Sequence, residues 1–144
     1  MRKNIILAGV GGQGVVLASK LIASCAMQKG ERAHTAETIG MAQRGGSVFS
    51  HVRIGEGAYS PLIPYGAADL IIGFEPSEAL RALPYLRAGG TVVVSSRAIA
   101  PTTATLSGAV FDTKQRIAAL RIKAARALYF SPGAISGANF VRTA

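Results

Sequence analysis

The sequence predicts an α/β fold, namely one doubly wound domain in three layers, with a mainly parallel sheet and a hairpin at its edge. Two observations lead to this prediction. Short apolar stretches rich in β-branched residues alternate along the chain with segments of helical periodicity, as in Rossmann-like domains. Of the 144 residues, 49% are hydrophobic and 16% are charged, and a parallel sheet covered on both faces needs such apolar strands. At this length we expect one domain over residues 1–130, and the lack of periodicity predicts an irregular tail over residues 131–144.

The start of the chain has the pattern that opens such a fold. A compact apolar strand is expected from Asn4 to Gly9, and the glycine-rich run Gly9–Gly14 follows it directly. A helix is expected next, stopped by Gly30, before a second strand from Arg32 to Ala36. The apolar residues of this helix recur at helical spacing: Val15, Val16, Leu17, Leu21, Ile22 and Met27.

The next part of the chain predicts a long loop and an edge hairpin. Glu37–Ser47 is too rich in glycine for a stable helix and too polar for a strand, so we expect a functional loop. Val48–Ile54 alternates with period two and predicts a half-buried strand. The turn Gly55–Gly57 should return the chain through Tyr59–Ile63, where prolines favour a sheet edge. One face of the strand would carry Val48, Ser50, Val52 and Ile54, and the other Phe49, His51 and Arg53.

The α/β alternation then resumes. Asp69–Phe74 predicts a buried strand, followed by a helix that Pro76 opens and two glycines close near residue 89. Thr91–Ser95 predicts a further strand, and Thr102–Val110 gives a weaker signal. Lys114–Leu128 predicts an amphipathic helix. Its inner face would carry Ile117, Leu120, Ala124 and Leu128.

The glycine run matches G-x-G-x-x-G between a strand and a helix. Such glycines let backbone amides and a helix N-terminus approach a phosphate. The same loop can also serve only to pack the helix closely on the strand, and the pattern leaves both interpretations open. In a nucleotide site, Glu37 would be the approximate candidate for binding a ribose. The candidate ligand-binding residues here are Gly11, Gly12, Gln13 and Gly14.

A second candidate lies in the long loop, where an arginine stands beside two glycines and a hydroxyl. This pattern can form an anion-binding nest, or it can be a turn with one surface arginine. Its members are Arg44, Gly45, Gly46 and Ser47. Glu75–Glu78 opens a helix after a strand, where a structural cap is favoured over a ligand site.

The sequence lacks the residues that several kinds of catalytic and metal chemistry require. Cys25 is the single cysteine, which excludes an internal disulfide and a self-contained iron–sulfur cluster. We expect it to be buried as a small hydrophobe. The two histidines have no zinc-ligand spacing, and His51 is expected to be a spacer on its strand rather than a base. We therefore predict no catalytic residues and no metal ligands in this chain.

The net charge of +9 raises the question of nucleic-acid binding. Six basic residues and no acids fall in residues 113–144, but that stretch has no recognisable binding motif. A solvated or partner-facing helix is favoured, with nucleic-acid binding as the weaker alternative. No run of about 20 apolar residues predicts a membrane span. The N-terminus lacks a signal-peptide cleavage pattern, so a cytoplasmic location is expected.

Three segments in order resemble the gamma subunit or domain of the pyruvate/2-oxoacid:ferredoxin oxidoreductases, over roughly residues 3–110. They are Gly9–Gly14, Gly40–Val48 leading to His51-Val52-Arg53, and Asp69–Pro76 with Ala79-Leu80. The version M-A-Q-R-G-G-S at residues 41–47, with S-P-L-I-P at residues 60–64, resembles the beta subunit of indolepyruvate oxidoreductases.

The resemblance implies an accessory role for this chain. A large partner subunit would carry thiamine diphosphate and iron–sulfur clusters, and the holoenzyme would convert an aryl pyruvate and coenzyme A to an acyl-CoA and carbon dioxide. Electrons would pass to ferredoxin. Arg44 and the Gly11–Gly14 loop would help to hold coenzyme A or to close the site. The remaining alternative is a free-standing Rossmann nucleotide-binding module or an NAD(P)-dependent oxidoreductase.

Overall fold

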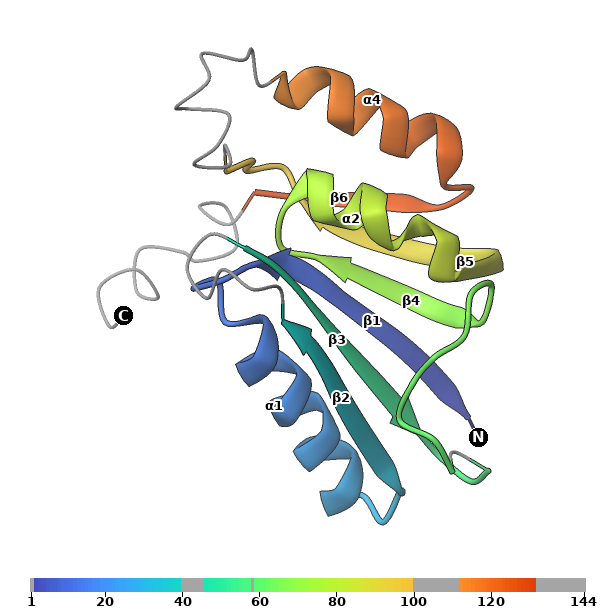
Figure 1. Ribbon diagram of the computed structural model, residues 1–144. Helices are drawn as coiled ribbons and strands as arrows, with labels where there is room; N and C mark the ends of the chain where they lie inside the picture. The colour runs from blue at the N-terminus through green and yellow to red at the C-terminus, as the bar shows by residue number, and fades with distance from the viewer. Residues whose placement is uncertain (1, 40–45, 58, 100–111, 132–144) are drawn as a thin grey trace.

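The computed structural model describes residues 2–39, 46–57, 59–99 and 112–131 (Figure 1). In chain order its elements are β1 (Lys3–Val10), α1 (Val15–Gln28), β2 (Ala33–Ile39), β3 (Ser47–Ile54), β4 (Ala68–Gly73), α2 (Pro76–Ala82), the 3-10 helix η1 (Leu83–Tyr85), β5 (Leu86–Ser95), α4 (Thr113–Lys123) and β6 (Ala127–Phe130).

The described strands form one sheet in the order β2-β3-β1-β4-β5-β6. The pairs β1–β4, β4–β5 and β5–β6 are parallel, whereas β3 is antiparallel to both of its neighbours. The sheet is therefore mainly parallel, which confirms the predicted α/β class. Because β3 lies between β1 and β2, the strand that follows the first helix is not adjacent to the first strand.

Helices cover both faces of the sheet, so the three layers are confirmed. Figure 1 shows α1 against one face and α2 with α4 against the other. Each face has its own apolar core: Leu7 and Val52 pack toward α1, and Ile6 and Val92 pack toward α2 and α4. Such two-sided burial requires strands that are apolar on both faces.

The alternation predicted for β3 is confirmed, but the strand is more buried than expected. Val48 and Val52 join the core under α1, while Phe49 packs against the core on the other face. His51 is only 4% exposed and Arg53 only 9%. The half-buried prediction was wrong because β3 is an interior strand with layers on both sides.

The expected return of a hairpin after Gly55–Gly57 is not formed. Residues 59–67 contain no strand, and Tyr59 is largely exposed. Pro61 and Pro64 offer no N–H to a ladder, and carbonyls of this segment are bound by the side chain of Arg53 instead. The antiparallel pairing of the sheet comes from β3 itself.

The later elements differ from the prediction at their ends. The last helix stops at Lys123, and the segment Ala127–Phe130 pairs with β5 as an edge strand. Alanine-rich sequence favours a helix locally, and pairing with β5 overrides that preference. Gly89 and Gly90 lie inside β5 rather than in a break before it. The weak signal at 102–110 and most of the 131–144 tail fall outside the described residues.

Cys25 is exposed, which corrects the expectation that it is buried. Helix α1 approaches the sheet through its small residues, since Ser19, Ala23 and Ala26 are buried. Small side chains allow close packing and leave several larger ones on the outer face. These exposed apolar side chains are Leu17, Leu21 and Met27.

Candidate functional site

The two glycine-containing candidate segments meet at the carboxyl end of β1. The amide of Gly11 donates a hydrogen bond of 2.9 Å to the carbonyl of Gly46. Beside it, Ser47 Oγ donates to Glu78 Oε2 at 2.5 Å. The glycine loop, the start of β3 and the start of α2 thus form one cluster, at the edge where open α/β sheets bind ligands. Arg44 and Gly45 lie outside the described residues.

The side chain of Gln13 is used inside the protein. Its Oε1 accepts from the amide of Val10 at 2.8 Å, and its Nε2 donates to the carbonyl of Phe74 at 3.2 Å. These bonds join the ends of β1 and β4 through a loop residue. Gln13 therefore fixes the shape of the glycine loop, while its backbone amide is bonded to the carbonyl of Val10.

A hollow of about 340 Å³ lies over this loop and the first turn of α1. Gly14 caps the helix with φ +80° and no side-chain bond, and the first turn contains no acid. The amides of Val15, Val16 and Leu17 have no preceding turn to accept them. The N-terminus of α1 can therefore bind an anionic group, and the walls around it can contact apolar parts of a ligand. The lining is Val10, Gly11, Gly12, Gly14, Val15, Val16, Leu17 and Val48.

Two carboxyl groups are buried beside the cluster. Glu75 caps α2 by accepting from the amides of Ser77 at 2.7 Å and Glu78 at 3.0 Å. Burial raises the pKa of Glu75, although these hydrogen bonds act in the opposite direction. The structural interpretation of Glu75 is supported, whereas the bond from Ser47 to Glu78 was not anticipated. The described residues include no group of three potential metal ligands from the His, Cys, Asp and Glu side chains.

A second polar cluster, which the sequence analysis missed as a unit, lies at the amino end of β1, opposite the glycine loop. The guanidinium of Arg53 donates to Asn4 Oδ1 at 3.1 Å and to the carbonyls of Ser60 at 2.8 Å and Leu62 at 3.2 Å. His51 Nδ1 accepts from the amide of Ile63 at 3.2 Å. These two side chains attach the 60–63 segment to the sheet. The period-two pattern, which placed both on one face, was the available signal.

We expect the free energy of unfolding to fall as the pH is lowered from 8 to 5, through His51. Burial lowers the pKa of His51 below its ordinary value of 6.5, so the unfolded chain binds a proton that the folded chain resists. This stability is fully present above pH 6.5 and is lost as the pH falls through 6.5 toward the folded pKa. Denaturant titrations across this range measure it.

The matched control is His51→Asn, whose Oδ1 can still accept from Ile63 but does not titrate. The difference in stability between the two proteins should change across this pH range. A constant difference would contradict the assignment. Glu75 has the opposite sign, because a raised pKa gives stability that is lost as the pH rises.

The strand order does not favour the dinucleotide interpretation. Glu37 lies on β2, opposite Ser50 of β3, which itself pairs with Leu7 of β1. Glu37 is therefore two strand spacings from β1, roughly 10 Å instead of 5 Å. A dinucleotide fingerprint relies on the strand next to β1 for its ribose-binding acid.

No helix in the described part of the chain combines the length and the apolar character needed to cross a bilayer.

Comparison with known proteins gives a consistent set of similarities. The model of the pyruvate ferredoxin/flavodoxin oxidoreductase family matches residues 4–136. The chain is 50% identical over 117 residues to indolepyruvate oxidoreductase subunit IorB of Archaeoglobus fulgidus, covering 81% of this chain and 58% of that protein. For IorB of Thermococcus kodakarensis the identity is 43% over 110 residues, covering 76% and 54%. The chain thus spans somewhat more than half the length of these curated relatives.

Solved structures agree with these similarities. The gamma subunit of a keto/oxoacid ferredoxin oxidoreductase from Geobacter sulfurreducens superposes with a TM-score of 0.52 at 25% identity, covering 69% of this chain and 56% of that chain. The pyruvate oxidoreductase subunit PORC of Thermotoga maritima gives a TM-score of 0.63 at 19% identity, covering 94% and 65%. At that identity the second similarity shows the fold alone.

Proposed function

The chain belongs to the pyruvate ferredoxin/flavodoxin oxidoreductase family. We therefore propose that it is an accessory subunit of a cytoplasmic 2-oxoacid:ferredoxin oxidoreductase that acts on indolepyruvate or another aryl pyruvate. The observation that carries the proposal is the 50% identity to an indolepyruvate oxidoreductase subunit over 81% of this chain. The M-A-Q-R-G-G-S segment at residues 41–47 supports the same substrate class.

In this proposal the redox cofactors belong to a large partner subunit. One cysteine in the whole sequence cannot supply the roughly four thiolates that an iron–sulfur cluster takes. The partner would hold thiamine diphosphate and the clusters, which supply oxidative decarboxylation and electron transfer to ferredoxin. The products would be an acyl-CoA and carbon dioxide.

The contribution of this chain would be made at the cluster around Gly11, Gly46 and Ser47. The hollow over the first turn of α1 combines a helix N-terminus that has no side-chain cap with apolar walls. Coenzyme A carries phosphates, which suit the helix N-terminus, and a pantetheine arm whose methyl and methylene groups can contact the apolar walls. We assign its positioning, or closure of the site over it, to the Gly11–Gly14 loop and to the segment Arg44–Ser47.

Replacing Arg44 by alanine should raise the KM for coenzyme A of the assembled enzyme by roughly 10-fold or more, since a guanidinium–phosphate bond contributes about 1.5–3 kcal/mol. Assembly and the KM for the 2-oxoacid should stay unchanged. Arg32→Ala is the control, because Arg32 is exposed just before β2, at the far edge of the sheet. Equal KM values for coenzyme A in Arg44→Ala and the unmodified enzyme would exclude this role.

The reaction itself is tested by reconstitution. The partner subunit, with and without this chain, is assayed anaerobically for ferredoxin reduction that depends on both indolepyruvate and coenzyme A. The proposal expects activity only when both subunits are present. Full activity of the partner alone would contradict the accessory role. Activity with pyruvate, but not with any aryl pyruvate, would contradict the substrate class.

A further inference from the structure

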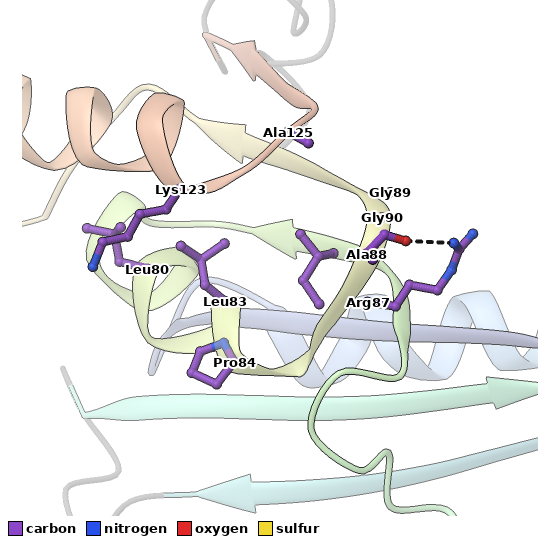
Figure 2. Close-up of a pocket in the computed structure, with 10 residues that line it drawn as sticks. Leu80, Leu83, Pro84, Arg87, Ala88, Gly89, Gly90, Lys123 and Ala125 are labelled. Carbon is purple, nitrogen blue, oxygen red and sulfur yellow. Dashed lines mark hydrogen bonds between the residues drawn. The ribbon is translucent and has the colours of Figure 1, made fainter.

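A groove of about 490 Å³ lies at the amino end of β5, on the side of the sheet that carries α2 and α4, away from the glycine loop (Figure 2). Side chains from the end of α2 and from η1 form its apolar part, and the close-up shows Leu80, Leu83 and Pro84 along it. The end of α4 and the start of β5 complete it. We call it the β5 groove. Its lining is Leu80, Leu83, Pro84, Leu86, Arg87, Ala88, Gly89, Gly90, Lys123 and Ala125.

One wall of the β5 groove is backbone that does not take part in the sheet ladder. Between the pairs Ala68–Leu86 and Leu70–Thr91, only Asp69 of β4 stands opposite the four residues 87–90 of β5. On the other side, pairing of β5 with β6 begins only at Val92. Ala88 and Gly89 are exposed, but the carbonyl of Ala88 already accepts from Arg87. The amides of Ala88 and Gly89 and the carbonyl of Gly89 remain for an incoming chain. Because Gly89 has φ +72°, an extended peptide would make one or two such bonds here rather than a full ladder.

The charge of the β5 groove has one sign. Figure 2 places Lys123 near Leu80, at one end, and Arg87 at the other end, beyond Gly89 and Gly90. Arg87 is already paired with Asp69 at 2.7 Å and donates to the carbonyl of Ala88 at 3.0 Å. Among the described residues Lys123 has no acceptor, and no acidic residue lines the groove. A net positive charge beside an apolar surface selects a ligand that is both anionic and apolar.

We propose that the β5 groove docks an extended acidic segment of a partner polypeptide. A carboxylate of that segment binds Lys123, an apolar side chain packs on Leu80 and Leu83, and its backbone lies along residues 88–90. A nucleic acid would satisfy the charge but not the apolar surface. The inference rests on the β5 groove alone, and it holds whether or not the chain works in the proposed oxidoreductase.

The test is a titration of the ¹⁵N-labelled full chain with the peptide acetyl-Glu-Leu-Glu-Leu-Glu-amide, followed by amide chemical shifts. Saturable shifts are expected at Ala88–Gly90 and at Lys123–Ala125. Two further peptides separate the contributions: one with glutamine in place of glutamate and one with serine in place of leucine. Both should bind at least about 10-fold more weakly, because each lacks one of the two matching features.

Lys123→Glu should weaken binding of the first peptide by about 10-fold or more. Lys20→Glu is the matched control, since Lys20 is exposed on α1, on the opposite face, and the change in net charge is the same. Equal losses in the two variants would show non-specific attraction and overturn the proposal. Shifts confined to other residues would also overturn it, as would a ten-residue oligothymidylate that binds the β5 groove more tightly than the peptide.

Discussion

Replacing Gly9 by alanine is expected to lower the free energy of unfolding by about 3 kcal/mol, the upper part of the range for overpacking a core. A Cβ at this position would lie 2.7 Å from Val15 Cγ2, 2.8 Å from Gln13 Oε1 and 2.9 Å from Phe74 Cβ. These atoms belong to α1, to the loop side chain that joins β1 to β4, and to the end of β4. None can move without disturbing the packing of helix on sheet. Chemical denaturation measures the loss of stability, and we expect the m-value to be unchanged.

Gly12→Ala is the control for the effect of Gly9→Ala on stability. Gly12 has φ +97° but no atom within 4 Å of an added Cβ, so its replacement costs backbone strain alone, about 1 kcal/mol. The double variant Gly9→Ala with Val15→Ala should be less destabilised than the sum of its parts, because the alanine at 15 removes one of the clashing atoms. Additive effects, or a greater loss at Gly12 than at Gly9, would contradict the packing role of Gly9.

The second large effect is expected at Arg53. Changing Arg53 to methionine retains much of the aliphatic volume but removes the bonds to Asn4, Ser60 and Leu62. Hydrogen bonds from a charged group contribute about 1.5–3 kcal/mol, and the buried side-chain oxygen of Asn4, left without this donor, adds to the cost. We expect a loss of about 3 kcal/mol in the free energy of unfolding. Hydrogen exchange of the Ile63 amide should accelerate at the same time, since Arg53 helps to hold that segment.

Arg87→Met is the matched control. Arg87 is exposed, and its ion pair with Asp69 is of the surface kind that contributes about 1 kcal/mol or less. Its loss should leave the exchange of Ile63 unchanged. If the two substitutions had equal effects, Arg53 would not be the group that fixes the 60–63 segment.

The three-layer α/β arrangement could be predicted from the sequence, because burial of the sheet on both faces leaves a direct signature in the spacing of hydrophobic residues. The predictions that were wrong concern elements whose structure depends on contacts distant in sequence. Nothing near Val48–Ile54 indicates that this strand inserts between β1 and β2 instead of forming an edge hairpin. Likewise, Ala127–Phe130 becomes a strand only because β5 offers its edge. Local helix preference is weak compared with such pairing.

The candidate site, too, could be predicted only in part from the sequence. Sequence spacing located both glycine segments, but it could not show that Gly11 bonds to Gly46 or that Ser47 bonds to Glu78. Nor could it separate the roles within the glycine run. In the structure Gly9 permits close packing, Gly14 is the left-handed N-cap at which α1 begins, and Gln13 fixes the loop. Both interpretations of the glycine pattern thus have physical support, packing at Gly9 and an open helix end at Gly14.

Affinity purification of the tagged chain from its native host, under anaerobic conditions, tests whether this chain functions within the proposed complex. Co-purifying proteins are identified, and thiamine diphosphate and iron are assayed in the eluate. We expect a large partner subunit that carries both, in fixed ratio to this chain. A chain that is recovered alone, without thiamine or iron, while the large subunit is present and active in the same extract, would contradict it.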